Sequence, residues 1–154
     1  TKYNVSYSDI AILFPYKQHK LIKYYFLYWL ETALDNADIP YSLITASLEG
    51  TFDRKRYSET NGVILSTIDS SLGLDFKAVI VTGLYPYNYV FGDNYYKKTI
   101  SSWRTIKEMP DDDRDQVQSQ MRSIYTACSR AREVLYVLSD LTEGTPMEEI
   151  LLKR

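Results

Sequence analysis

The sequence predicts a three-layer α/β fold with a mostly parallel sheet, built as one domain over residues 1–154. Residues 9–14 and 77–83 are short, continuous apolar runs, which are typical of strands buried on both faces of a parallel sheet. Directly after the first run, residues 17–37 carry apolar side chains at helical spacing. Strands of this kind that alternate with helices form βαβ units, whose strands are parallel.

The N-terminal part is expected to contain a strand, a long helix and a second strand. Pro15 stops the first strand, and Pro40 ends the helix of residues 17–37. Residues 41–45 form the second predicted strand, and residues 46–60 form a polar connection. The apolar stripe that is expected to face the sheet contains Leu21, Ile22, Tyr25, Phe26, Trp29, Ala33, Leu34 and Ala37.

The central part is expected to contain two more strands and then a long excursion from the sheet. Residues 62–66 and 77–83 are rich in β-branched side chains and are separated by a short polar stretch. Residues 85–114 show no clear periodicity, so they are expected to form the excursion, with a short helix at residues 100–108. The acidic run at residues 111–113 is interpreted as a solvated turn in preference to a metal site.

The C-terminal part is expected to form a helix, a strand and a short closing helix. These are residues 115–131, residues 133–139 and residues 147–152. The first of these helices is expected to turn one face toward the sheet, formed by Val117, Met121, Ile124, Tyr125 and Cys128.

Composition limits the class of protein. The formal net charge is -2, so any contact with nucleic acid must be local. The single cysteine, Cys128, excludes an internal disulfide, is interpreted as a small helix-packing residue, and is compatible with a reducing cytosol. No apolar stretch approaches the roughly 20 residues that a membrane helix needs. We therefore expect a soluble, cytoplasmic protein without a membrane partner.

Two arginines mark the junction between the predicted helix and strand at the C-terminal part. Arg130 and Arg132 lie where the helical pattern ends and the strand begins. Guanidinium groups are always ionised and match phosphate oxygens, so an arginine here is well placed to reach a nucleotide at the sheet edge. The alternative is a surface salt bridge, which many exposed arginines form without any part in chemistry.

The polar stretch of residues 66–76 concentrates hydroxyls and carboxylates after a strand. Ligands of open parallel sheets bind outside the carboxyl ends of the strands. Gly73 allows close approach of the backbone to a ligand, and Asp75 can accept a hydrogen bond from a ribose hydroxyl. The alternative is a capped turn, in which Thr67 or Asp69 caps a short helix and Gly73 is left-handed.

Taken in this order, the segments resemble the C-terminal, second RecA-like domain of superfamily 1 DNA helicases, the UvrD/Rep-like group. Residues 66–76 resemble motif V, Thr-x-His-x-x-Lys-Gly-Leu-Glu-Phe, and residues 121–133 resemble motif VI, Arg-x-x-x-Tyr-Val-Ala-x-Thr-Arg-Ala-Arg. The first strand, its helix and the turn at residues 39–41 are also similar to the family. The matching residues are Thr67, Gly73, Leu74, Asp75 and Phe76 in motif V, and Tyr125, Ala127, Arg130, Ala131 and Arg132 in motif VI.

The resemblance implies the RecA-like fold of P-loop NTPases and a role as the C-terminal motor domain of an ATP-dependent DNA helicase or translocase. It implies that Arg130 is an arginine finger, which reaches the γ-phosphate of ATP. ATP and Mg2+ are then held mainly by the N-terminal RecA-like domain of the same full-length protein. Gly73, Asp75 and Arg132 are implied to lie near the nucleotide. The residues implied to lie toward single-stranded DNA are Thr67, Asp69, Ser70 and Lys17.

The chain departs from the family pattern at several positions. Asp69 stands where the family has histidine, and Leu72 stands where it has lysine. Pro15 stands in the region where relatives often carry an arginine after the first strand, and Lys17, Gln18, His19 and Lys20 follow closely and could replace its phosphate contact. Tyr125 is expected to pack beneath the arginine loop. Coupling between ATP and DNA is therefore expected to be altered or weak.

No Gly-x-x-x-x-Gly-Lys-Ser/Thr phosphate loop occurs in the sequence. We therefore expect that this chain alone does not hydrolyse ATP and is a C-terminal fragment of a longer helicase with a minimal or absent accessory domain. Two alternatives stay open. The first is a degenerate helicase-like domain that serves as a non-catalytic protein-interaction module, which Asp69 and Leu72 favour. The second is an unrelated Rossmann-like nucleotide binder, against which the lack of a Gly-x-Gly-x-x-Gly motif argues.

Overall fold

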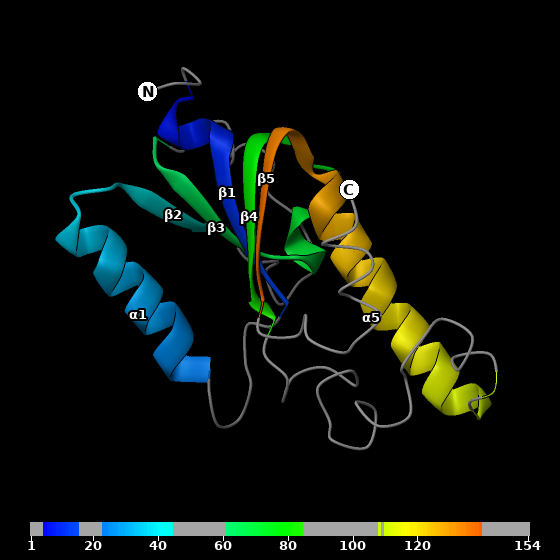
Figure 1. Cartoon of the computed structure of the whole chain (residues 1–154). Helices are drawn as coiled ribbons and strands as arrows, with labels where there is room; N and C mark the ends of the chain where they lie inside the picture. Colours follow the sequence, from blue (N-terminus) through cyan, green and yellow to red (C-terminus); the bar gives the residue numbers. More distant parts are fainter. Residues whose placement is uncertain (1–4, 16–22, 45–60, 85–107, 109, 140–154) are drawn as a thin grey trace.

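In the part of the chain that the computed structural model describes, five strands form one parallel sheet between two long helices (Figure 1). The described residues are 5–15, 23–44, 61–84, 108 and 110–139. The strands are β1 (Ile10–Phe14), β2 (Tyr41–Ile44), β3 (Val63–Thr67), β4 (Phe76–Leu84) and β5 (Ala131–Ser139). Their order is β2-β3-β1-β4-β5, and all neighbours pair in parallel. The predicted α/β class with a parallel sheet is confirmed.

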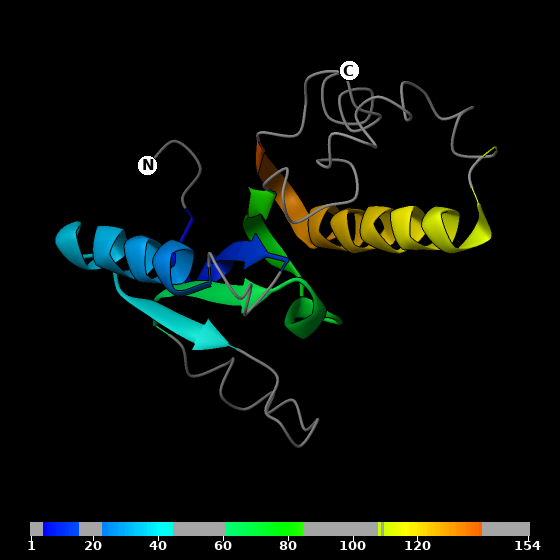
Figure 2. The same ribbon diagram turned by 90° about the horizontal axis from the view of Figure 1, so that it is seen from below.

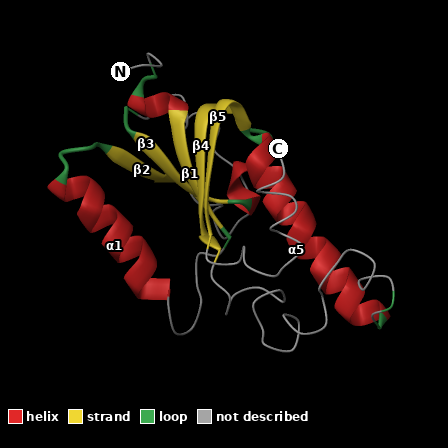
Figure 3. Ribbon diagram, viewed as in Figure 1, coloured by secondary structure: helices red, strands yellow, loops and turns green. Residues whose placement is uncertain are grey.

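The helices cover the two faces of the sheet and complete three layers. The long helices are α1 (Lys23–Asn36) and α5 (Asp111–Ser129), and the short 3-10 helices are η1 (Tyr7–Asp9) and η2 (Asp69–Ser71). Figures 1 and 3 show α1 on one side of the strands and α5, with η2 beside it, on the other. In Figure 2 the N-terminal half of α5, drawn in yellow, projects beyond the strands.

Side chains of the central strands alternate between two cores, one on each face of the sheet. The core under α5 contains Ala11, Leu13, Ile64, Ile68, Leu74, Phe76, Val79, Val81, Ile124 and Ala127. The core under α1 contains Ile12, Phe14, Leu34, Val63 and Leu65. Strands buried on both faces need apolar residues at successive positions, which is why these strands appear in the sequence as unbroken apolar runs.

The face that α1 turns toward the sheet differs from the predicted stripe. Leu34 is buried, and Leu27 and Leu30 pack against the same core, whereas Trp29 is 63% exposed. Residues 24–30 are apolar or aromatic throughout, so several helix faces fit the same spacing, and the leucine face is the one that packs. Of the other predicted stripe residues, Ala33 and Ala37 are exposed, while Leu21, Ile22 and the side chains of Tyr25 and Phe26 lie outside the described residues.

Helix α5 begins earlier than predicted, at Asp111. The acidic run is therefore the first turn of a helix and not a solvated turn. Carboxylates at this position interact favourably with the positive end of the helix dipole, and Asp111 also forms an ion pair with Arg114. The helix ends at Ser129, and β5 begins at Ala131, two residues before the predicted strand.

The inward face of α5 differs from the predicted one in that it includes Ala127 and not Tyr125, while the side chain of Val117 lies outside the described residues. Ile124 and Ala127 are buried in the core, with Met121 and Cys128 packed against it. Tyr125 is 74% exposed, so its expected position on the inward face and beneath the arginine loop is wrong. A tyrosine one residue after Ile124 is turned by roughly 100° around the helix, away from the sheet.

Several predicted features lie outside the described residues. They are the connection of residues 46–60, most of the excursion of residues 85–114 with its short helix, the closing helix of residues 147–152, and Lys17. Within the described ranges, no helix is both long and apolar enough to cross a membrane.

Candidate functional site

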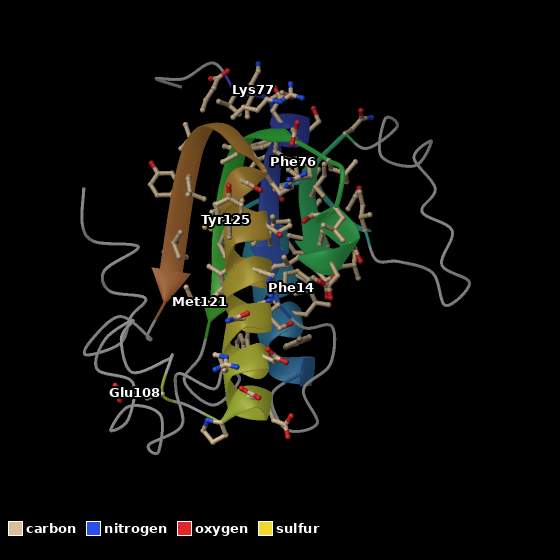
Figure 4. All side chains as sticks on the ribbon, turned by 90° about the vertical axis from the view of Figure 1, so that its right-hand side faces the viewer. Phe14, Phe76, Lys77, Glu108, Met121 and Tyr125 are labelled. Carbon is tan, nitrogen blue, oxygen red and sulfur yellow. The ribbon has the colours of Figure 1, made fainter. Side chains whose placement is uncertain are left out.

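The two ends of the polar stretch 66–76 lie at opposite edges of the sheet. Thr67 is the last residue of β3 and is level with Phe14, at the carboxyl ends of the strands. Phe76 opens β4 at the amino ends. Figure 4 shows Phe76 near Lys77 at one end of the sheet and Phe14 farther toward the other. The carboxyl edge that the sequence predicted for the whole stretch therefore holds only its first part.

At the amino edge, the side chain of Arg130 joins the end of α5 to the segment that leads into β4. Its Nε donates to the Thr126 carbonyl oxygen at 3.2 Å and its Nη1 to the Leu74 carbonyl oxygen at 3.2 Å. Its Nη2 donates to Ser129 Oγ at 3.1 Å. The backbone N–H of Phe76 donates to the Arg130 carbonyl oxygen at 2.9 Å. Arg130, whose side chain is only 21% exposed, is thus held in a fixed position.

Asp75 lies between the two arginines. Its Oδ1 is 3.6 Å from Nη1 of Arg130, and its Oδ2 is 3.5 Å from Nη2 of Arg132. The Asp75 side chain is 47% exposed and that of Arg132 is 66% exposed. The sequence singled out all three residues, and the structure brings them into one cluster. Because two guanidinium groups share one carboxylate, the cluster has an excess of positive charge.

A second ion pair at the same edge was missed by the sequence analysis. Lys77 Nζ lies 3.3 Å from Asp9 Oδ2, and both side chains are partly exposed. Asp9 directly precedes β1, and Lys77 is the second residue of β4. The only sequence signal was a charged residue at the start of each apolar run, which gives no information on pairing.

At the carboxyl edge, the side chain of Thr67 forms hydrogen bonds with Ser70 in the turn that contains η2. Its Oγ1 donates to Ser70 Oγ at 2.7 Å and accepts from the backbone N–H of Ser70 at 3.2 Å. Ser71 Oγ donates to the Ile68 carbonyl oxygen at 2.6 Å. Gly73 then adopts a φ of 80°, in the left-handed region. The left-handed Gly73 agrees with the turn that the sequence allowed as the alternative to a ligand loop, but the N-cap of η2 is Ile68 and not Thr67 or Asp69.

The residues that the resemblance placed toward DNA are distributed differently around this turn. Thr67 and Ser70 are buried, whereas Asp69 is exposed. Leu72, which stands where the family has lysine, is 61% exposed. The side chains on the outer surface of the turn are therefore an acidic one and an apolar one.

Cys128 has the packing role that the sequence predicted. It is partly buried and packs against the core under α5. Burial raises the pKa of its thiol above the ordinary value, because a thiolate is poorly solvated among apolar side chains.

Comparisons with known proteins give a distant structural match. No family model matches the chain, and no curated protein matches it. One similar solved structure is the C-terminal domain of a possible DNA helicase from Lactobacillus plantarum WCFS1, with 23% sequence identity and a TM-score of 0.44. The match covers 89% of this chain and 62% of that chain, so this chain spans less than two thirds of the matched structure's length.

Proposed function

We propose that this chain is the second motor domain of an ATP-dependent DNA helicase or translocase of the UvrD/Rep-like superfamily 1 type. The observation that carries the proposal is the cluster of Asp75, Arg130 and Arg132. These residues occupy the motif V-like and motif VI-like positions of the sequence, and they meet at one edge of a parallel sheet. An excess of guanidinium charge at an exposed edge suits the phosphate groups of a nucleotide.

In this proposal the cluster faces ATP that a second domain holds. The N-terminal RecA-like domain of the same full-length protein binds ATP and Mg2+, since this sequence has no phosphate loop. Arg130 acts as the arginine finger toward the γ-phosphate, and Arg132 adds positive charge beside it. Gly73, whose positive φ turns the chain toward the Asp75 segment, shapes the backbone near the nucleotide.

The proposed contact with single-stranded DNA involves the turn at the carboxyl edge, together with Lys17. The hydroxyls of Thr67 and Ser70 are hydrogen-bonded to each other and buried. They would therefore act by fixing the shape of the turn, while the exposed Asp69 and the backbone face the strand. A contact made mainly by backbone groups suits binding without sequence preference.

The test is the DNA-stimulated ATPase activity of the full-length protein with Arg130→Ala and Arg130→Lys. Loss of an arginine finger typically lowers turnover by about 10³-fold or more, and ATP binding should be retained. Arg122→Ala is the matched control, because Arg122 is an exposed arginine of α5 and, within the described part of the chain, its side chain donates to Gln118 Oε1 on the same helix. Unchanged ATP turnover in folded Arg130 variants would refute the role of Arg130 as an arginine finger.

A second candidate is a non-catalytic protein-interaction module derived from a helicase. The exposed Leu72 and Asp69 favour it, because an apolar and an acidic side chain replace the lysine and histidine of the family on the outer surface of the turn. Under the helicase proposal, the double variant Leu72→Lys with Asp69→His should raise DNA-stimulated turnover. A full-length protein that hydrolyses no ATP with single-stranded DNA, with or without these changes, would favour the module.

A further inference from the structure

Asp75 has an unusual position for a residue near a nucleotide phosphate. Its carboxylate is an anion, and it faces both guanidinium groups, at 3.6 and 3.5 Å. These are the groups that the proposed function directs toward phosphate oxygens. A phosphate that contacts both arginines must therefore compete with Asp75 for them.

Asp75 is not what holds Arg130 in place. Arg130 donates hydrogen bonds to Thr126, Leu74 and Ser129, none of which involves the carboxylate. Among the described residues, Arg132 forms one ion pair, and its partner is Asp75. Asp75 therefore acts mainly by lowering the positive charge of this edge of the sheet and by orienting Arg132.

The two ion pairs of Asp75 are of the kind that an external anion can replace. The Asp75 carboxylate is 47% exposed, so water screens both of its ion pairs, and pairs at these distances contribute little to stability. Two guanidinium groups and one carboxylate leave a surplus of one positive charge. A monovalent anion gains little by replacing a carboxylate of equal charge, whereas a multiply charged phosphate gains more from the two guanidinium groups.

We propose that Asp75 is an internal counter-ion of Arg130 and Arg132, and that these three residues form a site for multiply charged phosphate anions in which the anion displaces Asp75. The proposed function enters only in naming the natural ligand, which is the phosphate chain of a nucleoside triphosphate. The anion site itself depends on the described residues alone. Its free state is the arrangement seen here, with Asp75 in contact with both arginines.

The probe is inorganic pyrophosphate, titrated into the 154-residue chain at low ionic strength by calorimetry. Asp75→Asn keeps the shape of the side chain and removes its charge, so pyrophosphate should bind about tenfold more tightly. Arg132→Gln removes an exposed guanidinium and should weaken binding by about tenfold. Asp9→Asn is the matched control, because it removes the carboxylate paired with Lys77 at the same edge, and affinity should change by less than about twofold.

If Asp75→Asn binds pyrophosphate equally or more weakly than the native chain, the counter-ion role of Asp75 is refuted. It is also refuted if Asp9→Asn gains as much affinity as Asp75→Asn, because the gain would then reflect the lower negative charge of the protein as a whole. Thermal unfolding verifies that each variant is folded. If Asp75→Asn does not fold, the test is Arg132→Gln. Unchanged affinity of that variant for pyrophosphate would refute the proposed anion site.

The outcome is separable from the proposed function. A full-length protein without ATPase activity whose chain still shows the pyrophosphate response would refute the helicase proposal and support the anion site. An active ATPase whose Asp75→Asn variant binds pyrophosphate no better than the native chain would overturn the counter-ion and leave the helicase proposal standing.

Discussion

Replacing Arg130 with alanine is expected to destabilise the domain, apart from any effect on catalysis. The side chain is 21% exposed and donates three hydrogen bonds. Two lie within the end of α5, to Thr126 and Ser129, and the third joins α5 to Leu74 in the segment before β4. A hydrogen bond contributes about 1 kcal/mol net, and more when the donor is charged. The loss should therefore be about 3 kcal/mol, or roughly 6–12 °C in melting temperature for a domain of this size.

The measurement is urea and thermal unfolding of the chain, followed by circular dichroism. Arg132→Ala is the control, because Arg132 is 66% exposed and its ion pair with Asp75 spans 3.5 Å. Its free energy of unfolding should change by less than about 0.5 kcal/mol. Equal stability of the two variants would refute the structural role of Arg130. If the difference is found, lost turnover in an Arg130 variant can be assigned to catalysis only at temperatures where that variant is folded.

Three further changes test the packing of the fold. A Cβ at Gly62 would lie 2.3 Å from the Pro40 carbonyl oxygen, so Gly62→Ala should lower the free energy of unfolding in urea by about 3 kcal/mol. Asn61→Ala, at an exposed position, is the control. A loss at Gly62 as small as that at Asn61 would contradict the packing. Gly73 has open space around it but a φ of 80°, so Gly73→Ala should cost only about 1 kcal/mol, from backbone strain; a larger loss would indicate a clash. Burial raises the pKa of Cys128 above 9.0, so its alkylation by iodoacetamide should be slow at neutral pH and faster above pH 9.0. The stability gained by burying the neutral thiol is present below pH 9.0 and is lost as the pH rises through the raised pKa. Modification at neutral pH as fast as that of a free thiol would contradict this.

The three central strands, β1, β3 and β4, were predictable because burial in the sheet leaves a direct record in the sequence as an apolar run. Each of the five observed strands lies within about two residues of its prediction, although the edge strand β5 leaves Leu135, Tyr136 and Leu138 exposed. Helix faces were less predictable. In α1 the apolar residues surround the helix, so periodicity did not distinguish the face of Leu34 from that of Trp29. In α5 the small residue Ala127 marks the buried face, and Tyr125 does not.

The site was predictable as a set of residues but not as an arrangement. Asp75 and Arg130 are 55 positions apart in the chain, and they meet because β4 and β5 are neighbours that begin at the same edge. Strand order is a property of the whole sheet, which no local pattern contains. The same lack of information led the sequence analysis to assign Thr67 and Asp75 to one edge of the sheet.

The connection between β3 and β4 crosses the sheet from one edge to the other and is fixed to the core near both of its ends. It leaves the carboxyl edge at Thr67 and enters the amino edge at Phe76, and between them Ile68 and Leu74 are both anchored in the core under α5. A deleted residue between these anchors would shorten the connection and tend to pull one of them out of the core. It would also shift Asp75 relative to the arginines. Sequences that share this fold should therefore tolerate changes in the composition of this segment far more readily than its shortening.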